Sequence, residues 1–464
     1  MYKERQPFEG HQPFEGTQGR LTHRWYRTRL QVDKTSFQTK TEDVLRVMNK
    51  TSGRFVLILG LALAVLVWFL YTWSFKLTYG EIVLGLGDWG PGGGVTWGLF
   101  IGMFIWWVGI AHGGILVSAA VRLFKIRSLA PVARIAELTA LVALVCAVTG
   151  ILLQLGRLDR VFTSITSVLP RAIQHSPLVW DVTIITTYFT LTGTYILLTL
   201  RHDIYVLWPR LPRLLSPLYR LLTIGYQPEE DEKIERMVWW LALGLILLAP
   251  LLLHGGVIPW LFALLPSMPG FFGPVMGPVF LSLAIVSAFG VVTVIAYVFR
   301  RVHKWQDVFP DSTFAALGRA MMFSALLVLW LQLQLNVTGV YAPPIGVGRV
   351  TVAKLESAGY WLGIGPIAAS FIYLAVQGLF PRLFSVGRTA VAGLLVVLAV
   401  LVEKTLFIAE GLMLPGFLLY EEGSYSPSWV EISGVVGTVF IVVLYFTVIV
   451  KLIPVIEVRV LEER

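Results

Sequence analysis

The stretch FIWWVGIAHGGILVSAA, residues 104–120, identifies this chain as a membrane protein. It carries no acidic or basic residue apart from one histidine, and it lies inside a longer apolar run at 94–121. A helix needs about 20 apolar residues to cross a bilayer. Its single titratable residue, His112, is followed by two glycines. An imidazole in hydrocarbon is costly unless it is paired, buried in protein or used, so His112 is the first candidate site residue.

The rest of the chain has the same character. Of its 464 residues, 56% are hydrophobic and 14% are charged, against about 45–50% and about 25% in soluble proteins. We therefore predict an all-α integral membrane protein. Its ten expected transmembrane helices cover residues 55–76, 94–121, 134–156, 178–200, 237–256, 274–299, 314–337, 358–379, 389–413 and 434–453.

The distribution of basic residues predicts the orientation. Eleven Lys and Arg lie in residues 1–54, and others follow the second, fourth, sixth and eighth spans, whereas the loops 254–273 and 414–433 contain none. The positive-inside rule then places both termini in the cytoplasm, with a basic arm at 1–54 and a tail at 454–464. Because the net charge of +9 reflects topology, we expect no nucleic-acid partner.

Cysteine and histidine usage excludes several cofactors. The only cysteine, Cys146, lies in an apolar run, so the chain cannot form a disulfide or hold an iron–sulfur cluster by its own cysteines. No metal-ligand spacing is present, and we predict no metal site. A bis-histidine haem needs two histidines at matching depth on facing helices. His112 is near mid-membrane, whereas His254 is at the outer surface, where the fifth span ends. The pair therefore fits a haem site poorly.

Polar residues gather at the predicted outer ends of the third and fourth spans. Gln154 and Arg157 end the third span, and Asp181 lies about one turn inside the fourth. A carboxylate near an arginine and an imidazole can accept a proton from a hydroxyl and hold a carbonyl oxygen. The alternative is that Asp181 only stabilises the N-terminus of its helix. The outer loop between the two spans is unusually polar, with Arg157, Asp159, Arg160, Arg171 and His175.

His112 lies beside a stripe of small residues, because Gly98, Gly102, Gly109 and Gly113 recur at helical spacing. Small residues allow a neighbouring helix to approach closely, so His112 is expected to face the bundle. It lies about 22 Å along the helix from Trp97, near mid-membrane. It is then the bottom of a pocket, a step on a proton path towards Glu137, or a packed histidine.

Three more carboxylates are expected within spans. Glu137 lies in the third span, and Glu403 and Glu410 share one face of the ninth, with Lys404 between them. Charged residues in a membrane interior are usually paired or functional. Both alternatives, a structural ion pair and a proton path, stay open for Glu403 and Glu410.

Four motifs in order carry a family resemblance: WWVGIAHGGILVSA, ARIAELTAL, LQLGR and SPLVWD. Together they resemble the NrfD/PsrC-like polysulfide reductase membrane subunits, and with ten spans the chain is most similar to the ActC-type subunits of bacterial alternative complex III. The resemblance is carried by the second to fourth spans. It implies two four-helix bundles in the inner membrane, a quinol-site bundle at about 94–256 and a second at about 274–379. Spans 55–76, 389–413 and 434–453 would be additional helices.

The resemblance also implies a function: oxidation of a quinol (menaquinol or ubiquinol) near the outer face, without haem or iron–sulfur cluster in this chain. The implied partners are an extracytoplasmic iron–sulfur subunit, c-type haem subunits, a second NrfD-like subunit and membrane lipid. His112 and Asp181 would be catalytic. The expected quinol-binding residues are His112, Gln154, Arg157, Asp181, Arg171 and His175, and the expected proton path contains Glu137, Asp159, Glu403 and Glu410.

Two alternatives compete with this interpretation. The first is an ActF-like scaffold or proton-path subunit without a quinol site; Gln154 stands where the ActC pattern has a histidine, and it cannot take a proton. The second is a secondary transporter. Such proteins usually have paired broken helices in both halves, but MPGFFGPVMGP at 268–278 has no clear counterpart in the first half.

Overall fold

The computed structural model describes residues 34–87, 95–156, 158–160, 177–249, 258–263, 269–271, 273, 275–341, 346–413 and 424–458. Every regular element among them is helical. Nine helices of this described part are long and apolar enough to cross a membrane. They are α2 (Gly53–Tyr79), α3 (Leu99–Leu123), α4 (Ala130–Gln154), α7 (Pro177–Leu207), α11 (Met276–His303), α12 (Asp311–Tyr341), α14 (Ala358–Leu379), α15 (Val386–Met413) and α16 (Trp429–Leu452). The predicted all-α, multi-pass fold is confirmed.

The fifth expected span, 237–256, is not among these nine helices and corresponds in part to α9 (Asp231–Leu248). This helix begins with the highly charged sequence DEKIER, which leaves a short apolar stretch in its described part. Residues 250–257 lie outside the described part of the chain. The shorter helices are α1 (Lys34–Asn49), α8 (Ser216–Leu222), α10 (Ile258–Ala263) and α13 (Val347–Glu356).

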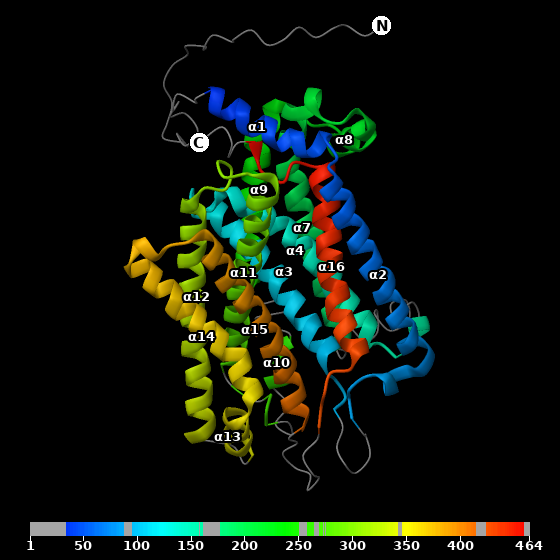
Figure 1. Ribbon diagram of the computed structural model, residues 1–464, viewed down its shortest axis with the longest axis vertical. Helices are drawn as coiled ribbons and strands as arrows, with labels where there is room; N and C mark the ends of the chain where they lie inside the picture. Colours follow the sequence, from blue (N-terminus) through cyan, green and yellow to red (C-terminus); the bar gives the residue numbers. More distant parts are fainter. Residues whose placement is uncertain are drawn as a thin grey trace.

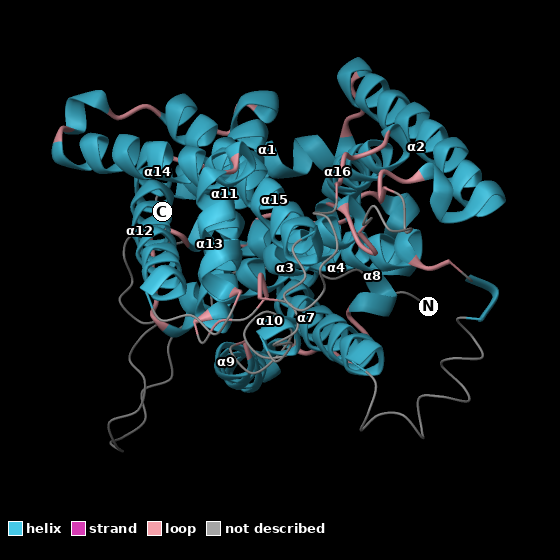
Figure 2. Cartoon of the chain, turned by 90° about the horizontal axis from the view of Figure 1, so that it is seen from below, coloured by secondary structure: helices cyan, strands magenta, loops and turns pink. Residues whose placement is uncertain are grey.

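The long helices form two groups of four and a flanking pair (Figure 1). In the first group, α3, α4, α7 and α9 pack in a ring; in the second group, α11, α12, α14 and α15 do the same. Thus α15, which covers the expected span 389–413, completes the second group. Helix α3 joins the two groups, because it also packs against α11 and α15. The pair α2 and α16 lies to one side, with α16 against α4 (Figure 2).

The position of α3 follows from its sequence. Nearly all its residues are buried. Its adjacent tryptophans reach two different neighbours: the indole of Trp106 donates to the Val397 carbonyl on α15 (3.1 Å), and that of Trp107 donates to Thr438 on α16 (3.0 Å). A methyl group at Gly102 would lie 2.6 Å from the Cα of Thr405. The predicted close approach along the glycine stripe is therefore present at Gly102, and at Gly113 against α11.

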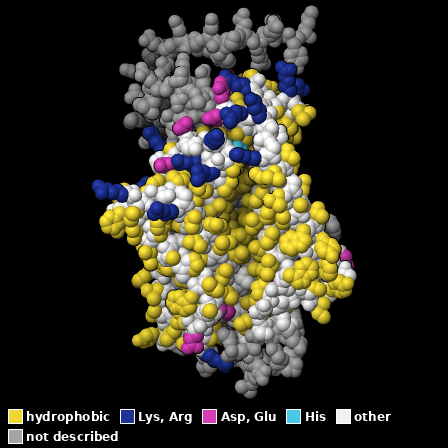
Figure 3. Space-filling model, in the orientation of Figure 1, with side chains coloured by type: hydrophobic (Ala, Val, Ile, Leu, Met, Phe, Trp, Pro, Cys, Tyr) yellow, Lys and Arg dark blue, Asp and Glu magenta, His cyan; other side chains and the backbone are white. Residues whose placement is uncertain are grey.

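The outer surface suits a bilayer. In α2, only Ala62, Phe69, Thr72 and Lys76 are buried, so most of this apolar helix faces outward. In the space-filling view, hydrophobic side chains cover the long sides, while most Lys and Arg gather at the end that carries α1 (Figure 3). We refer to this as the α1 end and to the opposite end as the α13 end (Figure 1).

Candidate functional site

His112 lies on α3 in the core of the first group and is completely buried. Its Nδ1 is 3.0 Å from the carbonyl oxygen of Val108 on the same helix. With the proton on Nδ1, this contact is a hydrogen bond that fixes the orientation of the ring. The imidazole also packs against the ring of Tyr188 on α7, with 4.0 Å between centroids. A histidine at this depth therefore faces a polar aromatic side chain and not lipid.

Tyr188 begins a polar face on α7. Tyr188, Thr192, Tyr195 and Asp203 are all buried, and their spacing places them on one side of the helix. Within the described part of the chain, the hydroxyls of Tyr188 and Thr192 are buried and have no hydrogen-bond partner. Buried hydroxyls normally have one. This face of α7 is therefore a candidate route for water or a proton through the first group.

The polar face leads to a carboxylate cluster around Glu137, on α4. Ser118 donates to Oε1 of Glu137 (2.6 Å), and the Ser118 hydroxyl is 3.4 Å from that of Tyr195. Two arginines flank the carboxylate: Arg122 at 3.2 Å and Arg134 at 3.3 Å. Glu137 is completely buried. Loss of either the Glu137 carboxylate or one of these arginines would cost stability, because the opposite charge would stay buried without its partner.

Two further carboxylates complete this cluster at the α1 end. Asp203 of α7 accepts from Arg134 (3.0 Å), and Glu457 pairs with Arg122. The backbone N–H of Val458 donates to Asp203 (3.2 Å). Residues 455, 456 and 458 are buried, so the segment after α16 closes the α1 end of the first group. Two guanidinium groups thus face three carboxylates.

Part of this cluster was not identified from the sequence, which singled out Glu137 alone. Arg134 lies three residues before Glu137, and Arg122 lies four residues after Ser118, so helical spacing contained a signal for both. The periodic Tyr188, Thr192, Tyr195 and Asp203 contained another. Nothing local in the sequence indicated that Glu457 would return to this site.

Apart from His112, most of the expected quinol-binding residues fall outside the described part of the chain. Arg157, Arg171 and His175 are outside it, as is the side chain of Asp181, although its backbone belongs to α7. Gln154 is the partly buried last residue of α4, and Asp159 is exposed on a turn at Leu158–Arg160. The structure therefore leaves the predicted grouping of these residues as a prediction.

The carboxylates of the second group lie on α15. Glu403 is 3.2 Å from the ammonium of its neighbour Lys404, and Gln332 of α12 donates to it (3.4 Å). The Lys404 ammonium also lies 3.3 Å from the ring centroid of Phe280. Lys404 thus pairs with Glu403 of its own helix. Glu410 accepts from Ser357 (3.0 Å).

These features define a class: a multi-pass membrane protein with buried titratable clusters in both four-helix groups. No set of three or more His, Cys, Asp or Glu residues in the described ranges is arranged to hold a metal ion. The family model for polysulphide reductase, NrfD, matches residues 90–416. The chain belongs to this family, as the sequence motifs predicted.

Two curated proteins are similar to this chain over most of its length. A putative membrane subunit of dimethyl sulfoxide reductase from Halobacterium salinarum is 27% identical over 407 residues, covering 82% of this chain and 87% of the relative. A selenate reductase subunit from Mesobacillus selenatarsenatis is 26% identical over 383 residues, covering 78% and 86%. Both names denote subunits of reductases.

Proposed function

We propose that this chain is the quinol-binding membrane subunit of a redox complex, which oxidises quinol and passes the electrons to a docked iron–sulfur subunit. One observation carries the proposal: in a chain of the NrfD family, a buried polar face runs along α7 from Tyr188, which touches His112, to the Glu137 cluster. Quinol oxidation releases protons as well as electrons, so a quinol site needs titratable groups and a route for protons.

Within this proposal the residues have separate roles. His112 and Asp181 take the protons of the quinol hydroxyls, and Gln154, Arg157, Arg171 and His175 bind the headgroup at the α13 end. A general base beside a hydroxyl contributes roughly 10²- to 10⁴-fold to proton-transfer rates. Glu137 continues the proton path towards the α1 end, and Asp159 is the residue of this path nearest the outer face. Glu403 and Glu410 provide titratable groups in the second group.

The proposed orientation puts the α1 end in the cytoplasm of a bacterial cell, with the inner membrane around the apolar sides. The gathering of Lys and Arg at this end (Figure 3) supports it, because cytoplasmic segments carry the excess of basic residues. The quinol site would then lie near the outer face, within reach of an extracytoplasmic iron–sulfur subunit.

The names of the relatives favour a particular setting. The subunits of dimethyl sulfoxide reductase and selenate reductase support a reductase complex, in which electrons from quinol reduce a terminal acceptor. Alternative complex III, with c-type haem subunits and a second NrfD-like subunit, is the second candidate, and the ten spans expected from the sequence favour it. An ActF-like scaffold or a secondary transporter would lack quinol activity.

Affinity purification of the native complex through a tag on this chain, followed by iron, sulfide, molybdenum and haem analysis, tests the proposal. We expect an iron–sulfur subunit to co-purify and added quinol to reduce its cluster. Co-purifying c-type haem would select alternative complex III, and a molybdenum-containing partner would select a reductase. A b-type haem spectrum assigned to this chain, or solute transport by the chain alone, would overturn the proposal.

A further inference from the structure

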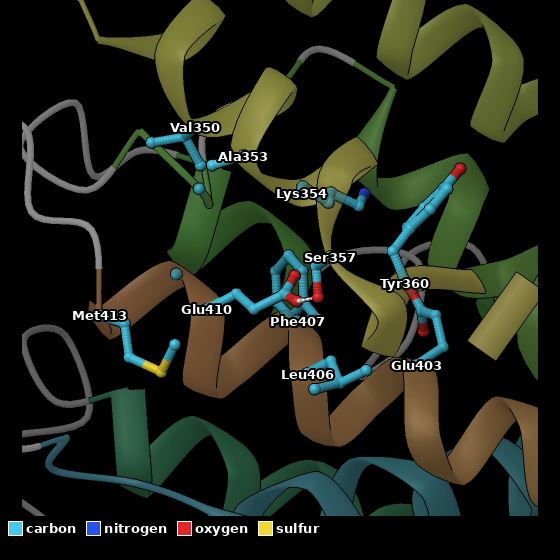
Figure 4. Close-up of a pocket in the computed structure, with 12 residues that line it drawn as sticks. Val350, Ala353, Lys354, Ser357, Tyr360, Glu403, Leu406, Phe407, Glu410 and Met413 are labelled. Carbon is cyan, nitrogen blue, oxygen red and sulfur yellow. Dashed lines mark hydrogen bonds between the residues drawn. The ribbon is translucent and has the colours of Figure 1, made fainter. Parts of the chain in front are cut away.

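A cavity of about 190 Å³ lies in the second group, at the α13 end, between helices α13, α14 and α15 (Figure 4). None of the residues that line it belongs to the helices that carry His112 or the Glu137 cluster. It therefore belongs to neither the proposed quinol site nor the path along α7. Pockets that bind drug-sized molecules measure about 300–1,000 Å³, so this cavity has room for a single ring.

The walls of the cavity combine apolar packing with convergent polar groups. Leu406 and Phe407 of α15 form part of the apolar wall (Figure 4). The polar groups come from all three helices and comprise Lys354, Ser357, Tyr360, Glu403 and Glu410. An apolar pocket with a few converging polar groups is the usual form of a small-molecule site.

The polar groups are held in place by contacts around the cavity. Ser357 donates to Oε1 of Glu410 (3.0 Å), as Figure 4 shows, which leaves the second carboxylate oxygen as a further acceptor. Asn336 of α12 donates to the hydroxyl of Tyr360 (2.6 Å), which fixes the Tyr360 ring at the edge of the cavity. The Lys354 ammonium lies 4.9 Å from the centroid of the Tyr360 ring. The cavity thus offers a donor, Lys354, and an acceptor, Glu410, in fixed positions.

The charges around the cavity select against an ionic ligand. An anion that approached Lys354 would meet the carboxylates of Glu403 and Glu410, and a cation that approached these would meet Lys354 and, behind Glu403, Lys404. Burial lowers the pKa of the Lys354 ammonium, while the attraction of Glu403 and Glu410 opposes this effect. A neutral ligand that accepts from an ammonium and donates to a carboxylate satisfies both sides.

We propose that this cavity is a second ring-binding site, which takes a neutral ring with oxygen substituents at opposite ends, the chemistry of a quinone headgroup. In its reduced, quinol form such a ring fits both ends: Lys354 donates to the oxygen of one hydroxyl, and Glu410 accepts from the hydroxyl at the opposite end. Leu406 and Phe407 contact the ring. The choice of a quinone among such rings rests on the proposed function. The site itself is inferred from the cavity and its polar groups, independently of that function.

The test uses the purified complex in lipid nanodiscs and a photoreactive azidoquinol, the reduced form that carries the hydroxyls, with labelled peptides identified by mass spectrometry. We expect label in peptides from 347–413 as well as in peptides from the first group. Lys354→Met and Glu410→Gln keep the side-chain size and remove one polar contact each. Each should decrease the label in 347–413 by about tenfold, the effect of losing a hydrogen bond to a charged group. The label in the first group should not change.

The control is Lys304→Met, which removes an exposed lysine at the opposite end of the second group. It should leave both labels unchanged. Label in the first group alone would overturn the second site and leave the proposed function standing. Label in 347–413 alone would support the second site and contradict the quinol site at His112, and label in neither group would overturn both. Label in 347–413 that persists in Lys354→Met and Glu410→Gln would also overturn the second site.

Discussion

The two four-helix groups share a ring architecture but hold their charges differently. In the first group, Arg122 and Arg134 face the carboxylates of Glu137, Asp203 and Glu457, and the α1 end is closed by the segment after α16. In the second group, Glu403 pairs with its neighbour Lys404, and the lysine and carboxylates at the α13 end border a cavity. A closed ion cluster stabilises helix packing and can pass protons, whereas a cavity with polar walls can accept a ligand.

The largest expected effect is on quinol oxidation, which we assign to the first group. Asp181→Asn should lower quinol:acceptor turnover by roughly 10²- to 10⁴-fold, the usual contribution of a general base, while the complex stays assembled. Steady-state turnover of the purified complex measures this. The control is Thr190→Val on the exposed side of the same helix, which should keep wild-type turnover. Wild-type turnover in an assembled Asp181→Asn complex would remove this residue from the site.

The next largest effect concerns the stability that the closed ion cluster gives to the first group. Glu137→Gln leaves Arg122 and Arg134 with one buried carboxylate fewer, and loss of one partner from a buried ion pair costs about 3–5 kcal/mol. Denaturant unfolding in detergent measures the free energy. The exposed control, Glu232→Gln on α9, should change it little. Equal effects of the two substitutions would contradict the description of the Glu137 cluster as a buried network.

A smaller effect tests the contact between the groups. Gly113→Ala puts a methyl group against the backbone carbonyl of Ala284 on α11, and overpacking of this kind costs about 1–3 kcal/mol. Gly193→Ala is the matched control, because a methyl group there meets no atom within 4 Å. If thermal unfolding shows the same stability for both variants, α3 and α11 are less closely packed than described.

The smallest effect concerns proton counting. If Glu403 and Glu410 relay protons, Glu403→Gln or Glu410→Gln should change the ratio of protons released to electrons transferred in proteoliposomes while turnover stays within a few-fold. Glu356→Gln, on the exposed side of α13, is the control. An unchanged ratio with a lower melting temperature would assign both carboxylates to structure alone.

Much of the fold was predictable because apolar length is a local property. The expected span 358–379 coincides with α14, and the expected spans 389–413 and 434–453 differ from α15 and α16 by a few residues. The expected span 237–256 matches α9 less well, because this helix begins six residues earlier, at Asp231, with a charged sequence that belongs to no apolar run.

The site was predictable only where its partners are close in sequence. The interior position of His112 followed from the neighbouring glycines, and the Arg134–Glu137 pair is three residues apart. Glu457 lies 335 residues from Arg122, and no local pattern indicates such a contact. Likewise, Lys404 has a carboxylate both beside it and within two turns, and only packing selects Glu403 as its partner.

The most direct test of the central claim is the reduction of the partner's iron–sulfur cluster by quinol, followed by electron paramagnetic resonance in wild-type and His112→Ala complexes. We expect rapid reduction in the wild type and a rate lower by at least about 100-fold in His112→Ala, whose cluster is still reduced fully by dithionite. Reduction by quinol at the wild-type rate in the assembled His112→Ala complex would contradict the claim.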